Sequence, residues 1–177
     1  MSRDLEKIIA GCKKGQNSAY NELVDNYSRK IYAYFYRLTG NRDISNDLLS
    51  ELFLKVIKNI KKFKDGSFDS WIYKIASNVF HDFLREKQKQ QKINSDYAKN
   101  AESFYSDRQH EKIDMGQHLQ NQLDKIDPDE KEVILLRFYS DLSFKEIAEI
   151  RNEPIGTTLS KLHRSLKKLR SLVGQSK

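Results

Sequence analysis

The sequence is poor in the residues that build disulfides, tight turns and membrane spans. Its 177 residues include one cysteine, Cys12, with two prolines and seven glycines. A single cysteine excludes an internal disulfide and a metal site built from cysteines. Scarce glycine and proline disfavour a β-sandwich or barrel, which needs many tight turns. No apolar run approaches the ~20 residues that span a bilayer, and the N-terminus lacks the apolar segment of a signal peptide.

Positive charge is in excess. Lys and Arg number 32 against 25 Asp and Glu, which gives a formal net charge of +7. Such a balance favours a polyanionic partner without proving one. We expect a soluble, cytoplasmic and mostly helical protein.

Apolar residues recur at steps of three and four through the first half of the chain, which predicts a helical bundle. Gly40 and Asn41 are placed to end one long helix, and Ser67 is placed to cap another. The residues of the three predicted buried faces are Tyr20, Leu23, Val24, Tyr27, Ile31, Tyr34, Phe35 and Leu38; Leu48, Leu49, Leu52, Phe53, Val56, Ile57 and Ile60; and Trp71, Ile72, Ile75, Val79 and Phe83.

The polar stretch that follows lacks sustained periodicity and divides the chain in two. We predict an all-α fold with a helical domain at 1–88, a flexible linker at 89–112 that could hold a helical turn, and a second helical domain at 113–177.

Helix-start signals recur in the second domain. Asp127 precedes Pro128, and Ser143 precedes Glu146 at the spacing of a capping box. A break around Pro154 then separates a short helix from a final one that starts near Gly156. This order predicts a helix-turn-helix.

The final helix divides into two faces. Thr158, Leu159, Leu162, Leu166 and Leu169 share an apolar arc, and the opposite face is basic, with no Asp or Glu from residue 156 onward. A solvated basic surface is the simpler explanation for such a face, although DNA recognition is favoured over it. A DNA-recognising helix is the functional alternative, because Lys and Arg reach guanine edges and phosphates in the major groove.

Signals for catalysis or metal binding are weak. Asp124, Asp127, Asp129 and Glu130 are explained by helix capping, and no phosphate-binding glycine loop or nucleophile–histidine pattern is present. His81 has no Cys or His companion at metal-binding spacing. We expect no enzymatic activity, no cofactor, no metal and no small-molecule substrate.

Four motifs together resemble bacterial sigma factors of the extracytoplasmic-function group. They are YRLTGNRD at 36–43, DLLSELFLKVIKNIKKF at 47–63, GSFDSWIYKIASNVFHDFLR at 66–85, and the whole segment 123–170. The resemblance implies a protein that binds core RNA polymerase, directs it to specific promoters and helps to melt the DNA. It also implies an anti-sigma partner.

The resemblance implies polymerase docking through Asp47, Leu48, Glu51 and Phe53. Asp43, Asp47 and Glu51 lie four residues apart and form an acidic stripe on a predicted helix, where a basic partner could bind. Ordinary solvation and the helix dipole are the alternative explanation for Asp43. Ser50 departs from the Gln common in the family.

The segment from Trp71 to Asn78 resembles the family's strand-separating segment, which captures a flipped base of the minus-ten element. Asn78 is the predicted base contact, because an amide can pair with an extruded base. The predicted phosphate contacts are Lys74, His81, Arg85 and Lys87. Trp71 could stack on a base, but a core role is favoured.

For the minus-thirty-five element, the predicted contacts are Thr157, Ser160, Lys161, Arg164 and Lys168. Leu159 stands where family members often carry Arg, and we expect it to pack against the core.

A stand-alone helix-turn-helix regulator with an N-terminal sensing or dimerising bundle is the alternative function. It would bind duplex DNA alone, usually as a dimer. The motifs around Asp47 and at 71–78 favour the sigma factor instead, and we expect a monomer outside its complexes.

Overall fold

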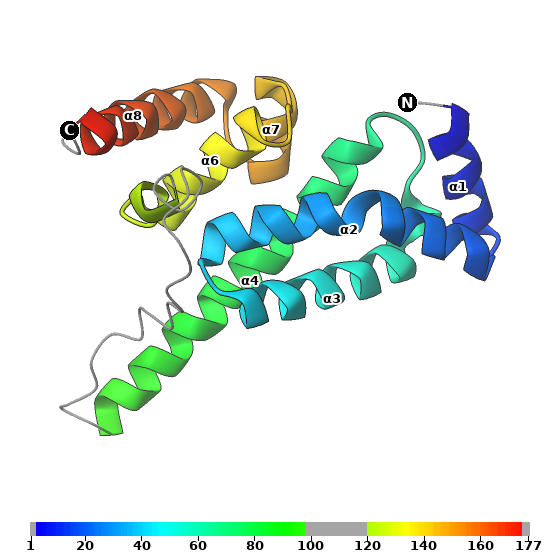
Figure 1. Ribbon diagram of the computed structural model, residues 1–177, viewed down its shortest axis with the longest axis horizontal. Helices are drawn as coiled ribbons and strands as arrows, with labels where there is room; N and C mark the ends of the chain where they lie inside the picture. The colour runs from blue at the N-terminus through cyan, green and yellow to red at the C-terminus, as the bar shows by residue number, and fades with distance from the viewer. Residues whose placement is uncertain (1–2, 98–119, 175–177) are drawn as a thin grey trace.

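The computed structural model describes residues 3–97 and 120–174, and the described chain is helical without any strand. Figure 1 shows two groups of helices, α1 to α4 and α6 to α8, lying against each other. The helices are α1 (Arg3–Lys13), α2 (Asn17–Thr39), α3 (Arg42–Asn59), the short 3-10 helix η1 (Ile60–Lys62), α4 (Phe68–Tyr97), α6 (Pro128–Phe138), α7 (Phe144–Arg151) and α8 (Ile155–Gly174).

The predicted buried faces of the N-terminal bundle are largely confirmed. Fully buried side chains on three helices, including Phe35, Leu52 and Ile72, form its core. Val24 and Ile57 are exceptions, because their side chains are exposed rather than buried.

The predicted helix ends of this bundle are confirmed at Gly40 and Ser67, whereas Asn41 starts α3 instead of ending α2. Gly40 ends α2 in the left-handed conformation, with φ of 65°, which glycine adopts without steric cost. The side chain of Asn41 accepts a hydrogen bond from the Ile44 backbone N–H at 2.9 Å and caps α3. The hydroxyl of Ser67 caps α4 by accepting from the Ser70 N–H at 3.0 Å.

Helix α4 is longer than predicted. It continues to Tyr97, so the prediction of a flexible linker from residue 89 is wrong for residues 89–97. Side chains 88–93 are exposed, and the helix projects beyond the bundle (Figure 1). Residues 98–112 of the predicted linker lie outside the described part of the chain.

The C-terminal helices begin where capping signals predicted. Asp127 accepts from the Asp129 N–H at 2.9 Å, and Ser143 and Glu146 form a reciprocal capping box. Asn152 ends α7 with φ of 52°, so the chain turns before α8 starts at Ile155.

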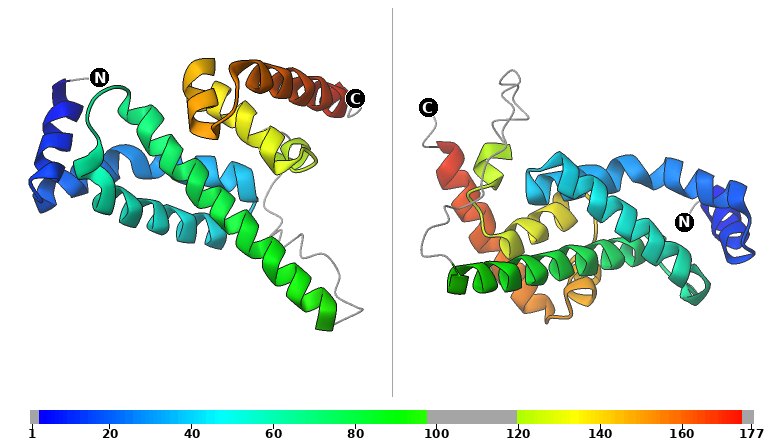
Figure 2. Two further views of the ribbon diagram at one scale, coloured as in Figure 1. Left: turned by 180° about the vertical axis from the view of Figure 1, so that it is seen from behind. Right: turned by 90° about the horizontal axis from the view of Figure 1, so that it is seen from below.

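The two groups of helices share one apolar core. Leu136, Leu142 and Ile147, all C-terminal, belong to the same buried cluster as the N-terminal bundle. Helix α7 packs on α4, and α6 approaches α2 (Figure 2). A smaller cluster around Val133 and Leu162 holds α8 against α6.

None of the described helices combines the length and the apolar character that a membrane crossing requires.

Candidate nucleic-acid interface

A buried carboxylate joins the two groups of helices. Glu132, on α6, is fully buried and accepts the Tyr34 hydroxyl of α2 at 2.9 Å. Its other oxygen lies 2.8 Å from Nε2 of His81 on α4 and also pairs with the Arg151 guanidinium of α7. Four helices therefore contribute to one polar network, which we call the Glu132 network.

The charges in this network support one another. Burial opposes the charge of Arg151, but Glu132 and Asp129 more than offset it, so the pKa of Arg151 is raised. Burial, reinforced by Glu132, raises the pKa of the Tyr34 hydroxyl well above its ordinary value, so Tyr34 remains a donor. The hydrogen bond to Glu132 raises the pKa of His81, against burial and Arg151.

The network does not fit a metal ion, although His81, Asp129 and Glu132 place potential ligand atoms within 4.8 Å of one another. The Arg151 guanidinium already pairs with both carboxylates. A divalent cation would meet that positive charge at the same oxygens.

A second polar contact links the groups at the end of α2. The buried Lys131 ammonium donates to the Leu38 carbonyl at 3.2 Å and pairs with Asp124 at 3.0 Å. The last carbonyls of a helix have no partner within it, so a buried cation there is favourable. Nearby, the Arg37 guanidinium lies 4.4 Å from the centre of the Tyr139 ring.

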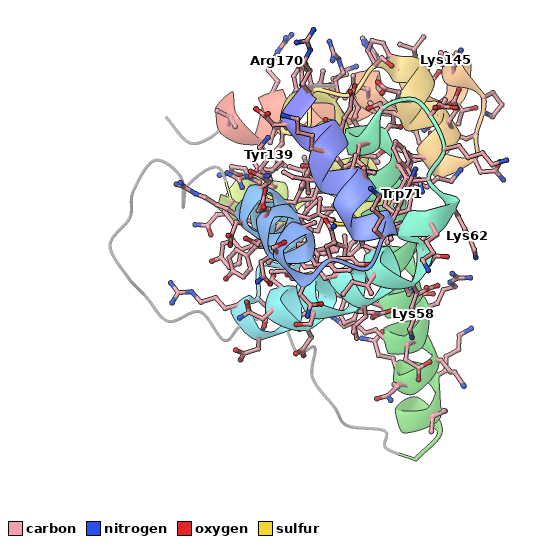
Figure 3. The ribbon with its side chains drawn as sticks, turned by 90° about the vertical axis from the view of Figure 1, so that its right-hand side faces the viewer. Lys58, Lys62, Trp71, Tyr139, Lys145 and Arg170 are labelled. Atoms are coloured by element: carbon pink, nitrogen blue, oxygen red, sulfur yellow. The ribbon has the colours of Figure 1, made fainter. Side chains whose placement is uncertain are left out.

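The outer face of α8 exposes most of the predicted DNA contacts. Thr157, Ser160, Arg164 and Lys168 are exposed. Arg170, further along the same helix, projects outward in Figure 3.

Two predictions for α8 need correction. Lys161 turns inward, because its ammonium pairs with Glu153 at 2.7 Å and Asp129 at 2.9 Å. Leu159 was expected to pack, yet it is 45% exposed. It lines a shallow depression together with Gly156, Thr157, Ser160, His163 and Arg164.

A groove of about 460 Å³ lies between α3 and α4 and brings together three of the predicted minus-ten residues. Asn78 and Lys74 are exposed on its wall, and Arg85 lies at one end. The complete lining is Lys55, Asn59, Lys62, Trp71, Lys74, Ile75, Asn78, Asp82 and Arg85.

Ion pairs brace this groove. The Lys55 ammonium lies 2.9 Å from Glu51 and 3.0 Å from Asp82, so it links α3 to α4. These partners raise the pKa of Lys55, Glu51 being the largest influence, and Lys55 in turn lowers that of Asp82. Arg85 also pairs with Asp82.

Trp71 lies both against the core and at the surface of the groove. It is half-buried against Phe63 and Phe68, with ring centres 5.5 and 5.3 Å away, and it also lines the groove. Figure 3 shows Lys58 and Lys62 on the same side of the molecule as Trp71.

His81 does not join the groove. Its ring faces Glu132 in the interior network, so a phosphate contact would compete with that ion pair. Lys87 is half-buried on the same helix and does not line the groove.

The outer face of α3 differs in part from the prediction. Asp47 is exposed, whereas Leu48 is buried in the core and cannot contact a partner directly. Glu51 and Phe53 are half-buried.

The sequence analysis did not predict that two apolar residues of α3 are exposed. Leu54 and Ile57 are 58% and 46% exposed, one helical turn apart. Periodicity assigned Ile57 to the core and left Leu54 out, because an exposed apolar pair on a partly buried helix has no distinct sequence signal.

Comparisons with known proteins give a consistent result. The model of Sigma-70 region 2 matches residues 23–90, and that of Sigma-70, region 4 matches 122–171, in this order. Together they cover about two thirds of the chain.

Relatives match over nearly the full length. The ECF RNA polymerase sigma factor SigW of Bacillus subtilis is 29% identical, over 96% of this chain and 97% of its own. The ECF RNA polymerase sigma-E factor of Haemophilus influenzae is 27% identical over 90% of each. The sigma factor RpoE from Bartonella quintana, solved with the anti-sigma factor NepR, shares the fold with a TM-score of 0.71 and 23% identity, over 89% of this chain and 98% of its own.

The position of His81 predicts a pH-dependent stability. Because its pKa is raised in the folded chain, the stabilisation is fully present below the ordinary histidine pKa of about 6.5 and is lost as pH rises through the raised value. His81→Gln keeps a donor toward Glu132 without titrating. Between about pH 6 and pH 8, the free energy of unfolding of the unmodified protein should fall relative to this variant in urea titrations.

His163→Gln is the matched control, because His163 is exposed on α8. Its pH profile should parallel that of the unmodified protein. Parallel profiles for the His81→Gln variant too would contradict the ion pair with Glu132.

Proposed function

Because this chain belongs to the sigma-70 family, in its extracytoplasmic-function group, we propose that its two groups of helices divide polymerase binding and promoter recognition between them. The protein is a sigma factor that directs RNA polymerase to specific promoters. The stand-alone regulator is not favoured, because both sigma regions match in order and relatives named as sigma factors align over nearly the whole chain.

The proposed domains are 1–88 for polymerase docking with minus-ten recognition and melting, and 113–177 for minus-thirty-five recognition, with 89–112 between them. The matches at 23–90 and 122–171 support this division. The first nine residues of the connecting segment extend α4, with the side chains of residues 89–93 exposed, so the connection starts as a helix.

We assign polymerase docking to the outer face of α3. Asp47 supplies exposed negative charge, and Leu54 and Ile57 supply exposed apolar area beside it. Glu51 adds a carboxylate that also pairs with Lys55. Charge steers such an encounter and a desolvated apolar centre supplies affinity. Phe53 borders this face, and buried Leu48 supports it from the core.

We assign the minus-ten element to the groove between α3 and α4. Asn78 presents an amide to an extruded base, half-buried Trp71 offers an aromatic surface, and Lys74 and Lys62 supply positive charge. Arg85 extends this basic lining, although its guanidinium also pairs with Asp82. Lys87 continues the basic side chains along α4. His81 is excluded from this set, because it is paired with Glu132.

We assign the minus-thirty-five element to Thr157, Ser160, Arg164 and Lys168 on the outer face of α8. Exposed cations and hydroxyls on a helix that follows a short turn fit the major groove and its phosphates. Lys161 is left out, because its charge is neutralised within the protein.

Further partners follow from the family. The RpoE structure includes an anti-sigma factor, and we propose that an anti-sigma factor also restrains this chain. We propose a cytoplasmic, non-enzymatic protein, because its partners would be core polymerase and promoter DNA.

The observation that carries the function is the match of both sigma regions, in order, to helices that expose the groove and the basic face of α8. Its test is run-off transcription on fragmented genomic DNA, using core RNA polymerase with and without this protein. We expect discrete new transcripts that depend on the protein. Tight binding to duplex DNA by the protein alone, without new transcripts, would support the stand-alone regulator.

Charge reversal on α3 tests the docking face. Asp47→Lys should weaken binding to core polymerase by about 1–2 kcal/mol, a five- to thirtyfold loss, because attraction becomes repulsion. Titration of labelled protein with core polymerase measures it. Asp25→Lys is the matched control, because Asp25 is exposed on α2, and this variant should bind core polymerase normally. Equal affinities for the two variants would remove Asp47 from the interface.

Asn78→Ala tests the groove. Loss of the amide contact to an extruded base should reduce promoter opening about tenfold while core binding stays unchanged. Permanganate reactivity of thymines in the melted region measures opening. Asn26→Ala, another exposed asparagine, is the control. Normal opening by the Asn78→Ala protein would show that Asn78 contacts no flipped base.

Arg164 and Lys161 should behave differently in the holoenzyme. Arg164→Ala should reduce the slope of log binding constant against log salt by about 0.9, the value for one lost phosphate contact. Lys161→Ala should leave that slope unchanged, because its ammonium is held by Glu153 and Asp129. A reduced slope for the Lys161→Ala protein instead would show that Lys161 turns outward to the DNA.

A further inference from the structure

Leu159 is an exposed leucine on the face of α8 that we assign to promoter DNA. It is 45% exposed near the start of α8, and it lines the shallow depression with Gly156, Ser160, His163 and Arg164. Core packing therefore does not explain this residue. An apolar side chain set among polar and basic ones offers a van der Waals contact to an apolar group of any molecule bound at this surface.

Gly156 makes this part of α8 accessible. A Cβ atom added there would meet nothing within 4 Å, and the residue does not adopt a positive φ. Neither packing nor backbone conformation therefore requires glycine at this position. Its effect is to keep the surface low beside Leu159, so that another molecule can approach the backbone closely.

The charge around Leu159 indicates the class of occupant. Arg164 lines the same depression, and the chain contains no Asp or Glu from Gly156 to its end. A polyanion fits such a surface. In the major groove of DNA, the C5-methyl of thymine is the apolar group that a side chain can contact.

We propose that Leu159 recognises a thymine of the minus-thirty-five element through van der Waals contact with its C5-methyl. The proposal rests on the assignment of α8 to that element, and it names the base specificity that the assignment lacks. Leucine has no hydrogen-bonding group, so it selects for the methyl and against a base edge that requires a donor or acceptor there.

Replacing thymine by deoxyuridine tests the proposal, because this change deletes only the methyl. The DNA is a promoter mapped by run-off transcription. Each thymine of its minus-thirty-five element, on either strand, is replaced singly. The protein is the full chain bound to core polymerase, and dissociation constants are measured at one salt concentration. One replacement should weaken binding of the unmodified holoenzyme about fourfold, the effect of one buried methyl group.

Variants at position 159 show whether Leu159 makes the contact. The Leu159→Ala holoenzyme should bind thymine and deoxyuridine promoters equally, whereas Leu159→Met should retain the discrimination, because methionine is apolar and of similar volume. Circular dichroism checks that each variant is folded. Val173→Ala is the matched control, because Val173 is 42% exposed further along the same helix, and it should retain the fourfold ratio.

The outcomes separate this proposal from the function on which it rests. Arg164→Ala should weaken binding to both DNAs and leave their ratio unchanged. Three results would overturn the role of Leu159 alone. They are a minus-thirty-five element without thymine, no effect of any replacement on binding, or an undiminished ratio of the deoxyuridine and thymine dissociation constants in the Leu159→Ala holoenzyme. A holoenzyme that produces no discrete transcripts would overturn the assignment of α8 as well.

Discussion

A carboxylate shut away from water needs partners, and Glu132 obtains them from three other helices. Tyr34, His81 and Arg151 reach it from α2, α4 and α7. Removing one partner of a buried ion pair costs about 3–5 kcal/mol, because the remaining charge stays buried without compensation. Packing of the two helical groups against each other is therefore what brings the compensating partners to the buried Glu132 charge. The shared apolar core and the contact of Lys131 with the end of α2 belong to the same closed arrangement.

This arrangement determines which surfaces remain for partners. Closure covers the facing sides of α4 and α7, where His81 and Arg151 turn inward. The outer face of α3, the groove with Asn78 and the outer face of α8 stay exposed. The surfaces that we assign to polymerase and promoter are therefore already exposed while the two groups of helices are packed together.

Local rules predicted much of this structure, and tertiary contacts explain where they failed. Gly40, Asp127 and Ser143 act within one or two turns of the chain, so their roles as helix signals were visible. The continuation of α4 past residue 88 has no apolar periodicity. Its Lys and Gln residues are good helix formers. That propensity indicated a helix here, but a search for apolar periodicity does not detect it.

The site was predicted as surfaces more accurately than as single residues. Asn78 and Arg164 are exposed as expected. The contact of His81 with Glu132 was not foreseen, because Glu132 lies 51 residues away in sequence. Lys161 on α8 pairs with Asp129 on α6. Residue spacing within one helix cannot reveal such a contact between two helices. On the inner side, Asp129, Glu132 and Glu153 pair with Arg151 and Lys161. Arg164 and Lys168 face outward on α8, which has no Asp or Glu of its own, so the outer face of this helix is positively charged.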